Sequence, residues 1–236
     1  MLYHLLYPLH EYFSFFNVFR YITFRTIYAI LTGLLISFVV GPWVIEKLRS
    51  FQIRQVVRED VPSRHMAKNG TPTMGGSLIL AALVIPTLLW SDLTNRYTWV
   101  VLLTSLSFGV LGFLDDYKKV RDKNGIGIKA RYKFPIQVAM ALVVSLILFF
   151  AFDHDSRLIF PFFKRVMPDL GNWYIVFAVL VIVGTANAVN LTDGLDGLAI
   201  GPVLISGGTF MLFCFLQGII DSLPIFKFRL SKAVGS

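Results

Sequence analysis

The chain has 236 residues, of which 56% are hydrophobic and 15% charged, with a formal net charge of +8. Its mean hydropathy is +0.68. A soluble domain of this length needs more charged side chains on its surface. The composition therefore excludes a soluble globular protein and indicates a protein that crosses a membrane several times.

Six segments are apolar on every face, as helices in a bilayer must be. In chain order they are Tyr21–Ile45, Met74–Trp90, Thr98–Leu114, Tyr132–Phe152, Trp173–Val189 and Leu198–Ile220. The second and third lie near the lower limit of about 17 residues for a span. The predicted fold is an all-α, polytopic transmembrane helix bundle of about six spans, with residues 1–236 in a single integral membrane domain.

Basic residues are distributed unevenly between the two sides of this predicted bundle. Thirteen lie in or beside the loops after spans one and three: Lys47, Arg49, Arg54, Arg58, Arg64, Lys68, Lys118, Lys119, Arg121, Lys123, Lys129, Arg131 and Lys133. The two opposite loops carry only Arg96, Arg157, Lys164 and Arg165. The excess of Lys and Arg in cytoplasmic loops then places residues 46–73, 115–131 and 190–197 in the cytoplasm.

Asp115 and Asp116 directly follow the third span. Paired carboxylates at a membrane edge are costly unless they bind a cation or a proton, so they are candidates for catalysis or metal binding. The alternative is a solvated helix end whose carboxylates pair with Lys118 and Lys119.

The loop after the fifth span reads NLTDGLDG and gives a stronger signal. Asp193 and Asp196 are three residues apart and would share a helix face. Gly194 and Gly197 would allow a ligand to approach the backbone closely. Asn190, Thr192 or Asp193 could cap the sixth span, whose N-terminus would favour a phosphate. Capping alone is the alternative, but it explains one polar residue and not four.

Two further groups of residues suit phosphate recognition. In the first loop, Lys68 is a candidate phosphate contact, and Thr71 offers a hydroxyl within a turn rich in glycine and proline. At the start of the fourth span, Lys129 and Lys133 form a basic cluster suited to a diphosphate or a lipid phosphate.

The segments GTPTMGG, GFLDDYKK and NAVNLTDGLDGLA, in this order and at these positions, resemble the phospho-N-acetylmuramoyl-pentapeptide transferases. These enzymes belong to the polyprenyl-phosphate N-acetylhexosamine-1-phosphate transferases. FNVFRYITFRT, QVVRED and PFFKRVMPDLG extend the resemblance to about Leu216.

The resemblance implies transfer of phospho-MurNAc-pentapeptide from its UDP carrier to undecaprenyl phosphate, giving lipid I and UMP with Mg²⁺ as cofactor. This is the first membrane step of peptidoglycan synthesis, at the bacterial inner membrane. Asp115 and Asp116 match the catalytic pair, with Asp115 the candidate base and Asp116 oriented to the metal. Asn190, Asp193 and Asp196 match a motif for nucleotide and metal binding, with Asp193 a candidate metal ligand. Lys68 matches a lysine of the uridine pocket. Homodimers are also implied, and no nucleic-acid partner is expected.

The family has about ten spans, so the resemblance leads us to expect a C-terminally truncated form with little or no activity alone. A later metal-binding aspartate and a histidine-rich loop of the family have no counterpart here. Four alternatives stay open at this stage: a sister transferase using UDP-GlcNAc, an inactive fragment, a non-catalytic membrane protein, and a transporter. The transporter is disfavoured because the carboxylates lie at one face and not at the midplane.

Overall fold

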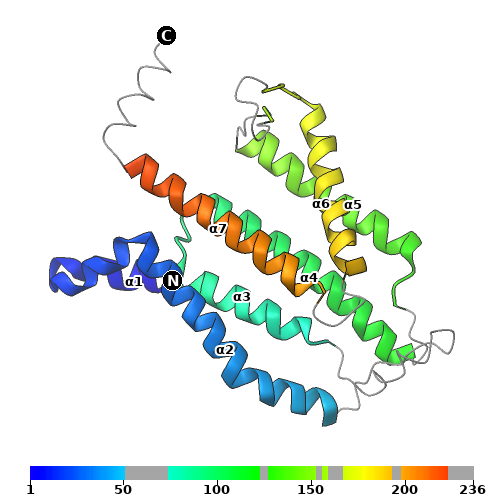
Figure 1. Cartoon of the computed structure of the whole chain (residues 1–236), viewed down its shortest axis with the longest axis horizontal. Coiled ribbons are helices and arrows are strands. Elements are labelled where there is room, and N and C mark those ends of the chain that lie inside the picture. The colour runs from blue at the N-terminus through cyan, green and yellow to red at the C-terminus, as the bar shows by residue number, and fades with distance from the viewer. Residues whose placement is uncertain (51–73, 123–126, 153–155, 159–166, 193–197, 223–236) are drawn as a thin grey trace. The chain divides into compact units, whose positions relative to one another are not determined.

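The computed structural model describes residues 1–50, 74–122, 127–152, 156–158, 167–192 and 198–222. Its elements are α1 (Leu2–Leu6), the 3₁₀ turns η1 (Tyr7–Glu11) and η2 (Ser14–Arg20), α2 (Ile22–Ser50), α3 (Gly76–Trp90), α4 (Arg96–Asp122), α5 (Ala130–Leu146), the π-helical turn η4 (Ile147–Ala151), α6 (Trp173–Thr192) and α7 (Ile200–Ser222). Outside the helices, the described residues contain one isolated β-bridge, between Arg157 and Asp169. The prediction of an all-α fold is confirmed (Figure 1).

Each of the six predicted spans corresponds to a helix. Four are long and apolar enough to cross a bilayer, namely Ile22–Leu48, Arg96–Asp122, Ala130–Ala151 and Trp173–Thr192. The other two, Gly76–Trp90 and Ile200–Leu216, are shorter apolar helices within the described residues. A helix of 15 residues such as α3 extends about 22 Å, less than the hydrocarbon thickness of about 30 Å.

The helix that contains the third predicted span extends beyond the span. The sequence placed its end at Leu114, but α4 continues through Asp115 and Asp116 to Asp122. Lysine and arginine are good helix formers, and Lys119 pairs with carboxylates one turn before it on the same helix. The two aspartates therefore lie on a helix and not in a loop.

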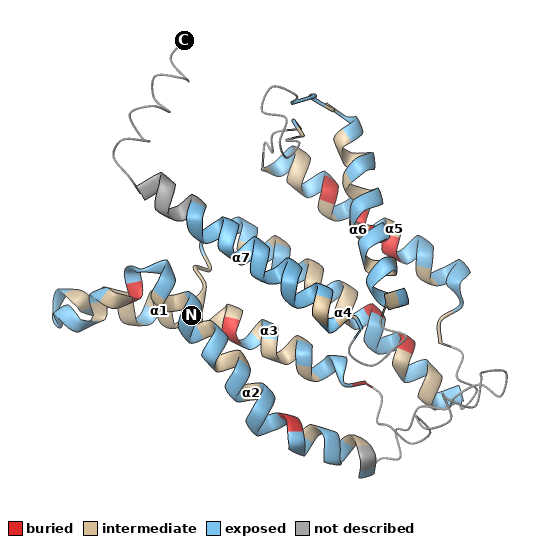
Figure 2. Cartoon of the chain, viewed as in Figure 1, coloured by how far each residue is buried: buried red, intermediate tan, exposed pale blue. Residues whose placement is uncertain are grey.

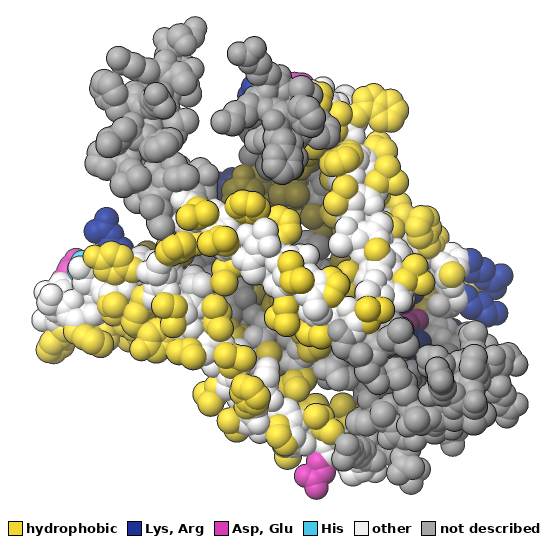
Figure 3. Space-filling model, viewed as in Figure 1, with side chains coloured by type: hydrophobic (Ala, Val, Ile, Leu, Met, Phe, Trp, Pro, Cys, Tyr) yellow, Lys and Arg dark blue, Asp and Glu magenta, His cyan; other side chains and the backbone are white. Residues whose placement is uncertain are grey.

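The helices expose most of their apolar side chains. In each of the four candidate spans, between 6% and 17% of the apolar 18-residue stretch is buried within the protein. Figure 2 shows exposed residues along most of α2 and α7 and intermediate ones along most of α3, and Figure 3 shows yellow hydrophobic side chains over much of the described part of the face in view. Exposed leucine and phenylalanine side chains are favourable where lipid tails are the solvent. This apolar surface is therefore typical of a membrane protein.

Residues 1–179 and 180–236 form two compact units, and the boundary between them falls within α6. In the first unit, α2 packs on α3, α3 on α4, and α4 on α5. Gly33 lets α2 approach α3 closely, because an added Cβ would lie 3.1 Å from the backbone oxygen of Ala82. The second unit contains the end of α6, where Val183 is buried, and α7.

Within the first unit, an aromatic cluster packs η2 against α2 and α3. The Trp90 ring stacks on Phe19 and contacts Phe24 and Tyr28. Its indole nitrogen donates a hydrogen bond of 2.9 Å to the Thr32 hydroxyl. Rings with one polar atom are favoured near a membrane interface, where the polar atom finds a partner.

Asp92 organises the turn between α3 and α4. Its Oδ1 accepts hydrogen bonds from the amide and the hydroxyl of Thr94, at 3.0 and 2.7 Å. His4 Nε2 lies 3.3 Å from Oδ1 and also accepts the Leu93 amide at 3.0 Å. These two His4 contacts need opposite protonation states of one nitrogen, so only one forms at a time.

The hydrogen bond from the Thr94 hydroxyl lowers the pKa of Asp92, and the Thr94 amide and the charges of His4 and Arg25 act in the same direction, while burial opposes them. A lowered pKa stabilises the folded state above the ordinary aspartate pKa of about 3.9, and this contribution is lost as the pH falls through the lowered value.

We therefore expect Asp92→Asn to lower the thermal unfolding midpoint at pH 6 and to have a smaller effect at pH 3. The measurement is thermal unfolding of the purified chain in detergent at both pH values, with the exposed Asp122→Asn variant as control. An equal effect of Asp92→Asn at pH 6 and pH 3 would contradict the assignment.

Candidate functional site at the end of helix α4

The Asp115 carboxylate is the buried polar centre of this region, with 6% of the residue exposed. Its Oδ1 accepts a hydrogen bond of 2.7 Å from the Ile128 amide. Its Oδ2 lies 2.8 Å from Nζ of Lys119 and 3.4 Å from Nζ of Lys133. Both carboxylate oxygens are thus engaged, which a buried charge requires in order to be stable.

Asp116 is the more accessible of the two aspartates, with 33% of its side chain exposed. Its Oδ1 lies 2.9 Å from Nζ of Lys119, so this lysine bridges both carboxylates. Among the described residues, its Oδ2 has no hydrogen-bond partner or ion pair. Within the described part of the chain, Asp116 therefore has one oxygen without a partner, whereas both oxygens of Asp115 are engaged.

Residues 127 and 128, shortly before α5, lie against the buried carboxylate. Ile128 supplies the amide, and Gly127 directly before it leaves room for the carboxylate to approach. A Cβ added at Gly127 would overlap Oδ1 of Asp115 and lie 2.8 Å from Cε of Lys119. Real Cβ atoms essentially never show contacts this short, so a larger residue here forces Asp115 and Lys119 or the backbone to shift.

Of the remaining site residues that the sequence predicts, the structure describes three. Lys133 lies in the first turns of α5 and reaches Asp115, while Lys129 is exposed at the N-cap of the same helix. Asn190 is exposed near the end of α6, in the second compact unit, and therefore does not cap α7. The other four predicted site residues, Lys68, Thr71, Asp193 and Asp196, lie outside the described residues.

The charges of the buried cluster balance, because two carboxylates face the ammonium groups of Lys119 and Lys133. Further basic side chains around the cluster are exposed: Lys118, Arg121, Lys129 and Arg131. These cations give this end of α4 and α5 a positive potential, which attracts phosphate groups. The site suits an anionic ligand more than a cationic one.

Magnesium binds oxygen ligands and commonly uses one or two carboxylates together with the phosphates of a substrate. No group of three or more His, Cys, Asp or Glu side chains suited to a metal occurs among the described residues. Asp116 fits as one ligand because of its available oxygen. Asp115 is less suited, because it is buried and both of its oxygens are already engaged by Lys119, Lys133 and the Ile128 amide.

The sequence interpretation gave Lys119 only a charge-pairing role, as part of the alternative of a solvated helix end. That pairing is present, but Asp115 is buried and not solvated. Lys119 lies four residues after Asp115 and three after Asp116. This helical spacing is the sequence signal that predicts its contacts with both aspartates. Gly127 and the Ile128 amide were missed, since no spacing rule indicates that a loop returns to the helix that precedes it.

The sequence pattern of glycosyl transferase family 4 matches residues 98–234, more than half of the chain. A shorter pattern, phospho-N-acetylmuramoyl-pentapeptide-transferase signature 1, matches residues 68–80. The two patterns together include the region of both aspartates and the start of α3.

Curated relatives match nearly all of the chain. A phospho-N-acetylmuramoyl-pentapeptide-transferase of Geobacter sp. (strain M21) is 57% identical over 218 residues, which are 92% of this chain and 61% of the relative. The proteins of the same name from Pelobacter propionicus and Syntrophus aciditrophicus are 57% and 53% identical, with the same coverage. The chain thus spans about three fifths of the length of these relatives.

We expect Gly127→Ala to destabilise the protein by about 1–3 kcal/mol, because the added methyl group displaces Ile128 and leaves the buried Asp115 oxygen without its amide donor. The measurement is thermal or denaturant unfolding in detergent. Gly112→Ala is the matched control, because Gly112 lies on α4 with open space around its Cβ position.

In that control, alanine should be neutral or slightly stabilising, since it favours a helix more than glycine does by about 0.5–1 kcal/mol. A Gly127→Ala protein as stable as Gly112→Ala would show that the Ile128 amide does not depend on the glycine.

Proposed function

The chain belongs to glycosyl transferase family 4, and from this premise we propose that it acts as a phospho-N-acetylmuramoyl-pentapeptide transferase. The reaction would transfer phospho-MurNAc-pentapeptide from UDP to undecaprenyl phosphate, releasing UMP and forming lipid I. The observation that carries the proposal is the 57% identity to a relative of that name over 92% of the chain. That match favours this activity over the UDP-GlcNAc transferase and the transporter.

The chemistry of the site supports this proposal. Two anions must meet in the reaction, a lipid phosphate and a sugar-nucleotide diphosphate. The exposed cations around the cluster, which include Lys129 and Arg131, attract and orient such groups. The apolar helices keep the tail of a lipid substrate in the bilayer while the charged end of α4 contacts its phosphate.

We further propose different roles for the two aspartates. Asp115 holds Lys119, Lys133 and the Ile128 amide in place, and is therefore a positioning residue. This differs from the expectation that Asp115 is the base, because its oxygens are already engaged. Asp116 has the oxygen that can accept a proton or contact a ligand.

Asp116 would also hold Mg²⁺, with Asp193 as a second candidate ligand outside the described residues. When bound, Mg²⁺ would neutralise the diphosphate and favour the departure of UMP. Lys119, which contacts both aspartates, keeps the Asp116 side chain oriented from one turn further along α4.

The location of the reaction follows as part of the same proposal. Because UDP-linked sugars are cytosolic, the charged end of α4 would face the cytoplasm, in the orientation that the distribution of Lys and Arg predicts. We place the protein in the bacterial inner membrane on this basis. Homodimer formation stays a prediction from the resemblance.

The test is UMP release from UDP-MurNAc-pentapeptide, with undecaprenyl phosphate and Mg²⁺. The enzyme is this chain fused to the C-terminal part of the Geobacter relative that the match does not cover, with the 236-residue chain alone in parallel. We expect lipid-dependent release that EDTA abolishes, and at least a 100-fold loss in Asp116→Asn with normal membrane insertion.

Asp122→Asn is the control, because it removes an exposed carboxylate from the same helix end and should leave turnover unchanged. Absence of UMP release from the inserted fusion protein would contradict the proposed activity. Normal turnover of Asp116→Asn would contradict the role of Asp116 alone.

A further inference from the structure

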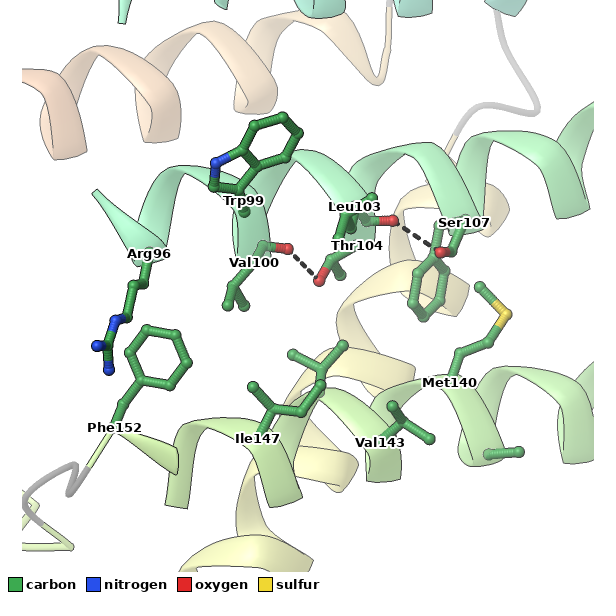
Figure 4. Close-up of a pocket in the computed structure, with 13 residues that line it drawn as sticks. Arg96, Trp99, Val100, Leu103, Thr104, Ser107, Met140, Val143, Ile147 and Phe152 are labelled. Atoms are coloured by element: carbon green, nitrogen blue, oxygen red, sulfur yellow. Dashed lines mark hydrogen bonds between the residues drawn. The ribbon is translucent and has the colours of Figure 1, made fainter. Parts of the chain in front are cut away.

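A narrow apolar groove lies between α4 and α5, away from the charged cluster. It has a volume of about 600 Å³. Its walls are mainly apolar side chains, among them Leu103, Phe108, Met140, Val143 and Ile147. Figure 4 shows Met140, Val143 and Ile147 projecting from α5 toward α4.

The polar side chains in the wall of the groove are already satisfied. The Thr104 hydroxyl donates to the carbonyl of Val100 at 2.6 Å, and the Ser107 hydroxyl donates to that of Leu103 at 2.7 Å (Figure 4). Hydroxyls bonded to their own helix present little polarity to a neighbour. The length of the groove therefore suits a hydrocarbon chain and no polar ligand.

One end of the groove is different, because a cation lies there. Arg96, the first residue of α4, lines the groove at the same end as Phe152. No hydrogen bond or ion pair joins Arg96 to another residue in the described part of the chain. A guanidinium presents five donors, and a phosphate is the anion that it binds best.

Aromatic rings surround this cationic end, as they do at the level of lipid headgroups. Trp99 lines the groove and donates its indole hydrogen to the carbonyl of Leu93 at 2.8 Å. Tyr97 contacts the ring of Phe152, with 4.9 Å between the ring centroids. The groove thus begins at an interfacial belt and runs into the apolar part of the bilayer.

The size of the groove matches one lipid chain. From Arg96 to Phe108 the helical rise of about 1.5 Å per residue gives a length of roughly 18 Å, close to half of a hydrocarbon core of about 30 Å.

We propose that this groove binds one acyl chain of an anionic phospholipid, with the lipid phosphate at Arg96. The bound lipid is not the substrate of the transfer reaction. Arg96 and Asp115 lie on the same helix about 28 Å apart by helical rise, so one phosphate cannot contact both. The proposal does not depend on transferase activity.

The proposal also gives the lipid a structural role. The groove separates the two helices whose other ends carry Asp115 and Lys133. An acyl chain in the groove supplies van der Waals contacts between α4 and α5, which are the main source of helix association in membranes.

Native mass spectrometry of the purified 236-residue chain in detergent tests the proposal, by titration with dioleoylphosphatidylglycerol and with dioleoylphosphatidylcholine. We expect preferential binding of phosphatidylglycerol. Arg96→Gln should weaken that binding about tenfold, the factor that corresponds to one charge-assisted hydrogen bond. Arg20→Gln is the matched control, since Arg20 is also exposed but does not line the groove.

A second variant tests the apolar part of the site. Val143→Trp places a large ring in the groove and should weaken binding of both lipids. Equal phosphatidylglycerol binding by wild type and Arg96→Gln would overturn the proposal, as would an equal loss in Arg20→Gln or unchanged binding in Val143→Trp. Arg96→Gln and Arg20→Gln change exposed residues, so the comparison between these two variants still tests the proposal if Val143→Trp does not fold.

Discussion

The buried carboxylate of Asp115 is the interaction on which the candidate site depends. A carboxylate with 6% exposure is stable only when its oxygens are paired. The partners come from three places: Lys119 on its own helix, Lys133 on the next helix, and the Ile128 amide in the connection between them. Removing any one of these partners leaves part of a buried charge unpaired. The Asp115 carboxylate therefore holds α4, α5 and Ile128 in one arrangement.

This polar centre stands in contrast to the rest of the bundle. In the candidate spans, only 6% to 17% of the most apolar stretch is buried within the described structure, so most of each span is left for contacts with lipid or with other helices. In such a fold the helices associate through close packing and through a few polar contacts, because lipid tails are as apolar as leucine. The groove between α4 and α5 belongs to this lipid-facing surface, and the charged cluster holds the same two helices together at their other ends.

Apolar segments predict the helices well here, because a bilayer selects for length and hydropathy more strongly than water selects for pattern. Helix α4 extends beyond the predicted span, since charged residues end a span but not a helix. The pairing of the aspartates with Lys119 could be deduced from helical spacing. The return of Gly127 and Ile128 to Asp115 could not, because it joins positions far apart along the chain through a loop. Asn190 falls in the other compact unit, so its relation to the aspartates stays a prediction.

A double-mutant cycle between Asp115 and Lys133 tests the central claim most directly. Unfolding free energies would be measured in detergent for Asp115→Asn, Lys133→Gln and the double variant. If Asp115 joins the two helices, the double variant loses less stability than the sum of the single variants, with a coupling of about 1 kcal/mol or more. Additivity within about 0.3 kcal/mol would show that the two residues act independently and would contradict the account.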